Sequence, residues 1–253
     1  MKKLMCACIL TVASLTAFSW GATGHRVTGY IANKYLSKKA RKAIDRILEG
    51  QSLAMASTWM DEVRSDSTYN YMTDWHWVTI PDGMTYEESA KNPNGDIIQT
   101  LERVIEELKS KKLSPQQERE YVKILIHLVG DIHQPLHVGR PDRGGNDIKV
   151  TWFRSDTNLH SVWDDGMIDG TKLSYTELAE SLLPPAPEEL AAWQKSTVRE
   201  WATESMTYRK QIYEIGNGRL WYEYGYKNLP AARLRLQQAG VRLATVLNEI
   251  FGK

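Results

Sequence analysis

The chain has 253 residues, which is enough for one large domain or two small ones. Lysine and arginine total 32 and aspartate and glutamate total 31, so the net charge is +1. This near neutrality excludes a generic polyanion-binding protein, which would carry a strongly basic surface. Because no linker, low-complexity tract or internal repeat divides the sequence, we predict one domain over residues 20–253.

The first nineteen residues have the pattern of an export signal. Lys2 and Lys3 are followed by an apolar run over residues 4–18, and small residues stand one and three places before a possible cut at Trp20. The run is too short to span a bilayer comfortably, which favours a cleaved signal peptide over residues 1–19 rather than a membrane anchor. We therefore predict an exported protein, periplasmic or secreted, whose mature chain begins at Trp20.

Both cysteines, Cys6 and Cys8, lie inside this predicted signal. The mature chain would therefore contain neither disulfides nor thiolate ligands for a metal. It would also lose Lys2 and Lys3, which changes the net charge from +1 to −1. If such a protein handles nucleic acid, something other than a lysine-rich surface has to attract the phosphates.

Most of the mature chain shows helical periodicity. Ser37 is placed to cap a helix that runs through Leu48, and Asp96 precedes an apolar helical stripe that ends near Leu108. The sequence Ser-Pro-Gln-Gln at 114–117 is a capping box with proline at the first helical position, and it opens a helix to about Gly130. A last helix is predicted after Pro230.

Two segments break the helical pattern. Residues 75–80 are aromatic and β-branched, and residues 148–152 alternate as a half-buried strand does. A loop rich in proline and glycine, residues 140–146, lies between them. We predict a mainly α domain with a small β-hairpin beside it, in which packing accounts for most of the nine tryptophans.

Two of the six histidines of the mature chain are followed by an aspartate four residues later. His127 and Asp131 are four residues apart on one predicted helix, which places both side chains on one face with about 5–6 Å between their Cβ atoms. His160 and Asp164 repeat this spacing, and His137 follows a proline that ends the helix. Imidazole and carboxylate without sulfur favour zinc, with iron or manganese as alternatives. One such pair would more often be a surface hydrogen bond, whereas two pairs predict a polynuclear metal site and leave the reaction open.

At this point the sequence resembles the S1/P1 nuclease family, the zinc-dependent single-strand nucleases of fungi, plants and some bacteria. The matching motifs follow one another in family order, and the helices from about Trp201 fit as well. They are Trp20-Gly-Ala-Thr-Gly-His25, Trp59-Met-Asp61, Trp75-His76-Trp77, the stretch His127-Leu-Val-Gly-Asp131-Ile-His-Gln-Pro-Leu-His137, Gly144-Gly145-Asn146 and Asn158-Leu-His160-Ser-Val-Trp-Asp164.

The resemblance implies three Zn²⁺ ions per chain, held by nine residues of this sequence. The first ion would be bound by Asp61, His76, His127 and Asp131. The second would take the α-amino group and carbonyl of Trp20, with His25 and the bridging Asp131. The third would be bound by His137, His160 and Asp164, and His133 is left over as a packed histidine.

The resemblance also implies roles beyond metal binding. Asp61 would orient the attacking water, and Arg64 would hold the phosphate oxygens that gain charge. Trp77 would stack on a base and Asn146 would contact the substrate, with packing as the alternative for Trp77 and a solvated helix arginine as the alternative for Arg64. Thr79 replaces an aspartate that contacts the base in some family members, which leaves the base preference open.

The implied fold is the single-domain, mostly helical fold that these nucleases share with zinc-dependent phospholipase C. The implied enzyme is an endonuclease that hydrolyses RNA and single-stranded DNA to 5′-phosphorylated products and has 3′-nucleotidase activity. A phospholipase C is the alternative, disfavoured by the short Trp20-to-His25 spacing and by Asp164 where such lipases carry glutamate. A non-catalytic zinc-binding protein is a further alternative. No membrane anchor and no protein partner are predicted.

Overall fold

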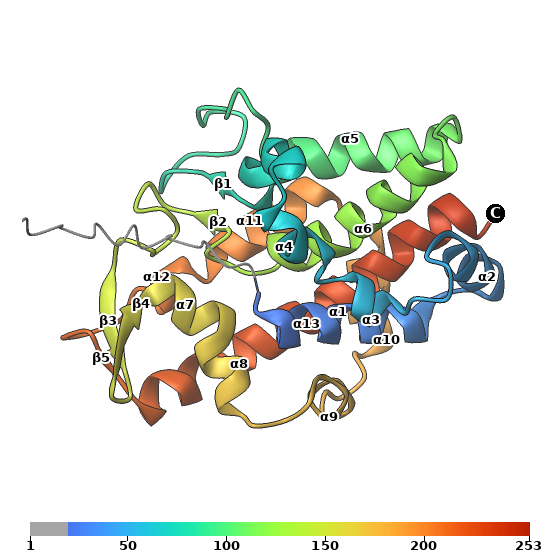
Figure 1. Ribbon diagram of the computed structural model, residues 1–253. Helices are drawn as coiled ribbons and strands as arrows, with labels where there is room; N and C mark the ends of the chain where they lie inside the picture. Colours follow the sequence, from blue (N-terminus) through green and yellow to red (C-terminus); the bar gives the residue numbers. More distant parts are fainter. Residues whose placement is uncertain (1–19) are drawn as a thin grey trace, which may run out of the picture.

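The computed structural model of the protein describes residues 20–253, and the predicted signal peptide over 1–19 lies outside the described residues. The fold is mainly α, with five short strands gathered at one end of the helical body (Figure 1). This confirms the predicted fold class. Across residues 20–253, no helix is long and apolar enough to cross a membrane.

Within residues 20–253, six helices of ten or more residues build most of the body, and shorter ones connect them. The long helices are α1 (Ala22–Tyr35), α5 (Ile97–Ser110), α6 (Pro115–Ile132), α11 (Val198–Thr207) and α13 (Tyr222–Phe251), joined on one side by α2 (Lys38–Ile47). The shorter helices are α3 (Leu53–Ala56), α4 (Trp59–Glu62), α7 (Leu159–Ser161), α8 (Met167–Gly170), α9 (Tyr175–Glu180), α10 (Pro187–Lys195) and α12 (Arg209–Ile212). Two 3₁₀ segments, η1 (Val63–Ser65) and η2 (Ser67–His76), follow α4, and a π-helical turn, η3 (Val162–Gly166), follows α7.

The predicted helix starts are confirmed by their caps. The Ser37 hydroxyl accepts a hydrogen bond from the Ala40 amide at the start of α2, and the Asp96 carboxylate accepts from two amides at the start of α5. Ser114 and Gln117 form the complete capping box at the start of α6. Each cap satisfies amides that lack a partner inside the helix, so polar residues at these positions fix where the helices begin. Helix α6 ends at Ile132, two residues beyond the predicted end.

The predicted start of the last helix is wrong. Helix α13 begins at Tyr222, and Pro230 lies inside it. Proline normally breaks a helix because it lacks an N–H group. Here tertiary contacts fix the turn before it: the Tyr224 hydroxyl donates to Ile212 O at 2.7 Å and accepts from Trp163 Nε1 at 2.9 Å, and Asn228 is buried.

The strands form two small sheets. The expected strand over residues 75–80 is largely wrong, because residues 67–76 form η2 and only β1 (Val78–Thr79) is extended; it pairs in parallel with β2 (Val138–Gly139). The predicted strand over residues 148–152 is confirmed as β3 (Lys149–Trp152), but its antiparallel hairpin partner is β4 (Ser155–Asn158), which was not predicted. The third strand of that sheet, β5 (Arg219–Leu220), lies in parallel with β3 and was not predicted.

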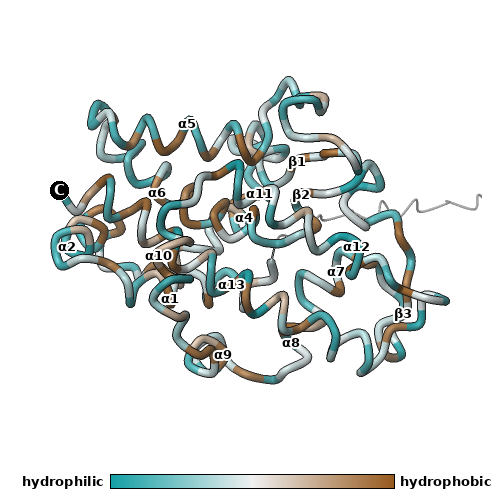
Figure 2. Tube along the Cα trace, turned by 180° about the vertical axis from the view of Figure 1, so that it is seen from behind, coloured by the Kyte–Doolittle hydropathy of each residue, from teal (hydrophilic) through white to brown (hydrophobic). Residues whose placement is uncertain are grey.

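Apolar side chains form two core clusters, one among α2, α5, α6 and the end of α13, the other around α1, α7, α8 and the first half of α13. Hydrophobic and hydrophilic stretches alternate along α5, as expected of helices with one buried side (Figure 2). Helices α1 and α13 approach closely, since an added Cβ at Gly240 would lie 2.5 Å from Ile31 Cβ. This contact fixes the face of α1 that carries His25.

We expect Gly240→Ala to lower the free energy of unfolding by about 1–3 kcal/mol, because the new methyl group overlaps Ile31. Gly225→Ala is the matched control in the same helix, since its Cβ would meet only the ring of Trp152 at 3.4 Å. That variant should be neutral or slightly more stable, because alanine has the higher helix propensity. Urea unfolding measures both; equal effects would contradict the close packing of α1 on α13.

Candidate metal centre

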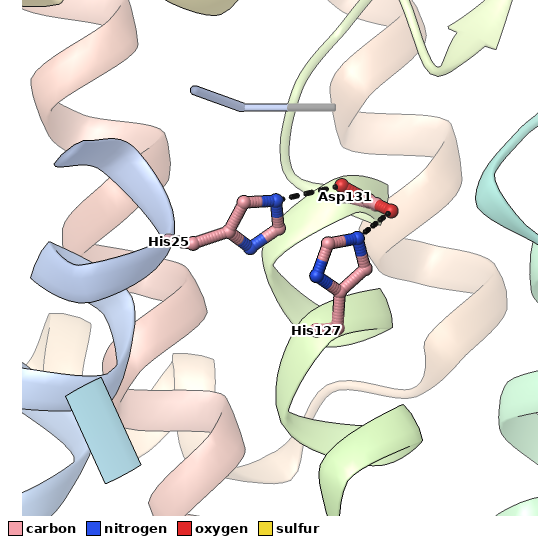
Figure 3. A group of neighbouring side chains, drawn as sticks. All are labelled: His25, His127 and Asp131. Carbon is pink, nitrogen blue, oxygen red and sulfur yellow. Dashed lines mark ion pairs between the residues drawn. The ribbon is translucent and has the colours of Figure 1, made fainter. Parts of the chain in front are cut away.

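Asp131, in the last turn of α6, lies between two histidines from different helices (Figure 3). His25 of α1 places Nε2 3.2 Å from Asp131 Oδ1, and His127, one turn earlier in α6, places Nε2 3.1 Å from Asp131 Oδ2. The two imidazole rings stack with their centroids 4.0 Å apart. All three side chains are buried. The predicted four-residue spacing therefore does put His127 and Asp131 on one face, turned toward the interior.

A second group adjoins the first on the side of α4 and η2. Asp61 lies in α4 and His76 ends η2; with His127 they bring ligand atoms within 4.8 Å of one another. His76 Nδ1 lies 2.9 Å from Asp131 Oδ2 and 3.1 Å from His127 Nε2. Asp131 thus contacts both groups: its Oδ1 faces His25, and its Oδ2 faces His76 and His127.

His137, His160 and Asp164 form the third group, and all three are buried. His137 follows the turn after α6, as Pro135 predicts, while His160 and Asp164 come from α7 and the π-helical turn η3. His160 Nε2 lies 3.1 Å from Asp164 Oδ2 and 3.2 Å from His137 Nε2. A helical i,i+4 pair was predicted here, and a π-helical turn, a form that recurs at functional sites, brings the two residues together.

Backbone carbonyls determine which ring nitrogen is free to bind a metal in each of three histidines. His127 Nδ1 lies 2.7 Å from Ser57 O, His137 Nδ1 2.7 Å from His76 O, and His160 Nδ1 2.7 Å from Gly144 O. A carbonyl only accepts, so each Nδ1 carries the proton and each neutral ring has its lone pair on Nε2. Gly144 can bring its carbonyl this close because it has φ +59° and because a Cβ there would lie 2.2 Å from Leu136 O.

The donor atoms fit a cation. With both Nδ1 atoms protonated, the lone pairs of His137 Nε2 and His160 Nε2 face one another across 3.2 Å, an arrangement that is repulsive unless a positive charge lies between them. A tetrahedral ion with bonds of about 2.0–2.1 Å separates its donor atoms by about 3.3 Å, close to the spacings found here. Nitrogen and oxygen donors without sulfur suit Zn²⁺.

His133 lies outside these groups, as predicted. Its Nδ1 lies 2.7 Å from Val129 O, and its Nε2 lies 2.9 Å from the Arg242 guanidinium. Its ring packs on Trp201 with centroids 5.4 Å apart. Both nitrogens are therefore engaged by the protein, and His133 is a packed histidine.

The electrostatics keep the central carboxylate ionised. Burial would raise the pKa of Asp131, but the nearby His127 and His137 and the imidazole hydrogen bonds hold it well below its usual range. Burial lowers the pKa of His76 to about 4, which keeps that imidazole neutral and able to bind a metal. Burial also disfavours protonation of His127, but the charges of Asp131 and Asp61 outweigh it and raise its pKa.

Trp20 is fully buried at the start of α1, next to the third group. The amide of the following residue, Gly21, donates to Asp164 O at 2.9 Å. An added Cβ at Gly21 would lie 1.7 Å from Asp165 Oδ1, so this end of the chain sits tightly against the 164–165 turn. Trp20 thus lies at the end of the chain that packs on the Asp164 turn, and its role as a ligand with His25 and Asp131 stays a prediction.

A pocket of about 290 Å³ opens beside the second and third groups. The predicted substrate residues Arg64, Trp77 and Asn146 all line it, together with Thr79 and Arg143. Arg64 Nη2 also lies 2.9 Å from Asp61 Oδ1. Three residues predicted from separate stretches of the sequence therefore meet at one cavity, whereas Arg143 was not predicted.

The comparisons agree with this geometry. The sequence profile described as S1/P1 Nuclease matches residues 20–252. The chain belongs to the S1/P1 nuclease family. It is 29% identical to Endonuclease 2 of Arabidopsis thaliana over 96% of this chain and 94% of that protein. It is 28% identical to Nuclease P1 of Penicillium citrinum (92% of this chain, 98% of that protein) and to Nuclease S1 of Aspergillus oryzae (96% of each). Membership of this family makes the protein a nuclease.

Arg209 of this nuclease holds two of the His/Asp groups in register, and the sequence did not predict this role. The β1–β2 pair joins the chain just after His76 to the chain just after His137, with Val78 N donating to His137 O at 2.8 Å. The buried Arg209 guanidinium donates to the carbonyls of Val138, Gly139 and Ile80 and to the carboxylate of Asp82. All its N–H groups are used, so one side chain closes a sheet of two-residue strands that could not persist alone.

We expect Arg209→Lys to bind less metal and to unfold at lower denaturant concentration. A lysine has three donors in a different geometry and leaves buried carbonyls unsatisfied, at about 1–3 kcal/mol each. Elemental analysis and urea unfolding measure the two effects. Arg199→Lys is the control, because Arg199 is exposed and bonds only to carboxylates. Full metal content in Arg209→Lys would show that the β1–β2 pair does not depend on this side chain.

Proposed function

We propose that this nuclease hydrolyses RNA and single-stranded DNA to 5′-phosphorylated products with three bound Zn²⁺ ions, and that it also acts on 3′-nucleotides. The observation that carries the proposal is the set of three His/Asp groups around Asp131 and beside the pocket. The relatives are named nucleases and endonucleases, which supports this substrate class.

The proposed ligands follow the three groups. Asp61, His76, His127 and Asp131 would hold one ion, His137, His160 and Asp164 another, and Trp20, His25 and Asp131 the remaining one. Bound zinc lowers the pKa of its water and neutralises charge on phosphate oxygens. Three divalent cations against three carboxylates leave a formal charge of about +3, so the metal centre would attract phosphates that a near-neutral surface does not.

The side chains around the centre divide the remaining work. The Asp61 carboxylate is placed to accept a proton from the attacking water and to orient it. Arg64, 2.9 Å from Asp61 and in the pocket wall, would donate to the phosphate oxygens as they gain charge. Its planar fork suits this role better than a lysine would.

The pocket beside the centre would hold the nucleotide. Trp77 offers a ring on which a base can stack, which is sequence-tolerant because every base has a π-face. The Asn146 amide donates to Arg143 O at 2.9 Å, so it shapes the loop and has an oxygen left for the substrate. Thr79 also lines the pocket and offers a small hydroxyl in place of a carboxylate.

The remaining parts of the proposal concern the whole chain. Residues 20–253 form one nuclease domain, and residues 1–19 are removed on export to the periplasm or the medium. A phospholipase C with the same metals is the second candidate function. The names of the relatives argue against a phospholipase C, because these relatives are named nucleases or endonucleases. A zinc-storage role leaves the Arg64-lined pocket without a purpose.

An activity panel on the zinc-loaded mature protein tests the proposed substrate class. Single-stranded DNA, RNA and 3′-AMP should be hydrolysed, and end-group analysis should find 5′-phosphates on the cleaved strands. Duplex DNA is the control substrate and should be cut far more slowly. Rapid release of phosphocholine from phosphatidylcholine, with inert RNA, would overturn the proposal in favour of a lipase.

Arg64→Ala should keep its zinc and lose turnover by about 10²-fold or more, on the scale of removing one donor to developing charge. Asp61→Asn is the companion variant, and it should lose both zinc and activity because a neutral amide is a poorer ligand. Elemental analysis and initial rates on RNA separate the two outcomes. Undiminished turnover in Arg64→Ala would reduce Arg64 to a partner of Asp61.

A chain that starts at Trp20 should bind one more zinc than a chain extended by a single residue. A peptide nitrogen has its lone pair delocalised into the carbonyl and does not coordinate as an amine does. The free amine has an ordinary pKa of about 7.7–8.0 and loses its proton readily beside zinc. An aminopeptidase that removes the extra residue should restore zinc and turnover. Equal zinc counts in both forms would exclude the amine of Trp20 as a ligand.

A further inference from the structure

A row of aromatic rings lies beside the metal centre, outside the pocket. Trp59 of α4 and Tyr69, Tyr71 and Trp75 of η2 follow one another at centroid distances of 5.3, 6.4 and 5.2 Å. We call these four residues the aromatic ridge. Tyr71, the third of them, is 54% exposed, whereas Trp59, Tyr69 and Trp75 pack partly against the core. The ridge thus has one solvent-exposed ring, that of Tyr71, held by neighbouring rings that pack against the core.

Two cations flank the ridge without a carboxylate partner. The Arg103 guanidinium lies over the ring of Trp75 at 4.8 Å, and Lys123 Nζ lies over the ring of Trp59 at 5.3 Å. Within residues 20–253 neither side chain forms an ion pair, and Arg103 Nη1 donates to the neutral Tyr121 hydroxyl at 3.3 Å. Their charges are therefore available to a phosphate on either side of Tyr71.

The acidic residues of this face are engaged with neutral partners. Glu62 accepts from the Thr58 hydroxyl, Asp66 from the Thr68 amide, Asp74 from the Asn94 amide group and Glu120 from Gln116. Glu62 and Glu120 still act on Lys123 through their charge, and Glu120 also acts on Tyr71, but neither forms an ion pair with Lys123. A polyanion on the ridge therefore meets Arg103 beside Trp75 and Lys123 beside Trp59, with two carboxylates near Lys123.

The ridge is continuous with the candidate substrate site. The η2 segment begins two residues after η1, which carries Arg64, and ends at the metal-binding His76. It packs against both α5 and α6, and Figure 1 shows it (teal) between α4 and the start of α5. Arg64 and Tyr71 belong to consecutive 3₁₀ segments, so a strand whose phosphate lies at Arg64 can extend toward the ridge.

We propose that the aromatic ridge is an accessory binding site for single-stranded nucleic acid, separate from the pocket that Trp77 lines. A base stacks on the open ring of Tyr71, and Arg103 and Lys123 bind the phosphates on either side. The alternation of an open ring with unpaired cations matches the alternation of base and phosphate along a strand. The substrate class rests on the proposed function, whereas the site itself rests on the ridge.

The test compares a long strand with a mononucleotide. In zinc-loaded protein, Tyr71→Ala should weaken binding of a fluorescein-labelled, phosphorothioate-linked oligodeoxythymidylate of about twelve nucleotides roughly tenfold, on the scale of one base stack. Hydrolysis of 3′-AMP, which is too short to reach the ridge, should be unchanged. Tyr226→Ala is the matched control, because Tyr226 is 86% exposed and belongs to α13. It should change neither measurement.

The salt dependence of oligonucleotide binding tests the role of Arg103 and Lys123. Each phosphate contact of a single strand contributes about −0.7 to the slope of log affinity against log salt. The double variant Arg103→Gln/Lys123→Gln should therefore reduce the slope for the oligonucleotide by about 1.4. An unchanged slope would remove the two cations from the proposal.

The outcomes separate this inference from the proposed function. Unchanged oligonucleotide affinity in Tyr71→Ala, or an equal loss on 3′-AMP, overturns the ridge while the nuclease assignment stands. Tyr71-dependent oligonucleotide binding by a protein that hydrolyses no strand would keep the ridge and overturn the proposed function. Tyr71-dependent binding to anionic phospholipid vesicles, without oligonucleotide binding, would assign the ridge to a lipid surface and overturn this inference.

Discussion

The buried carboxylate of Asp131 is the group around which the rest of the site is arranged. An ionised carboxylate without solvent is very costly unless positive or polar partners surround it. Here three imidazoles, of His25, His76 and His127, lie within 3.2 Å of its two oxygens. They come from α1, η2 and α6, so the requirement to compensate one charge brings three distant parts of the chain together.

The scaffold explains how this arrangement is held. Helix α6 carries His127 and Asp131 on its buried face, and its capped start fixes the register of that face. Close packing of α1 on α13 at Gly240 sets the depth of His25. On the other side, Arg209 closes the β1–β2 pair and so sets the distance between His76 and His137. Each metal-binding group thus depends on a packing contact outside the site.

The sequence predicts local features well because they depend on neighbouring residues. The caps at Ser37, Asp96 and Ser114 and the pairing of His127 with Asp131 follow from short-range chemistry. The start of α13 was mispredicted because the contacts of Tyr224 that sustain the helix before Pro230 come from residues far along the chain.

The candidate site likewise combines features that the local sequence predicts with features that depend on long-range contacts. The motifs predict that the candidate metal ligands and Arg64 lie together. In the structure Arg64 and three of the candidate ligands line one cavity, and the others form the His/Asp groups beside it. Arg209 carries no local signal, since an arginine between Tyr208 and Lys210 looks like a solvated residue, and only the fold buries it against three carbonyls. The aromatic ridge was equally hidden, because its tyrosines and tryptophans have the same sequence pattern as core residues.

The central claim is that the two oxygens of Asp131 serve two different metal ions and that a third ion lies apart from them. Anomalous diffraction at the zinc absorption edge, from crystals of the zinc-loaded chain that starts at Trp20, tests this directly. The account predicts three peaks: one on each side of the Asp131 carboxylate and one among His137, His160 and Asp164. A single peak at Asp131, or none between His137 and His160, would contradict it.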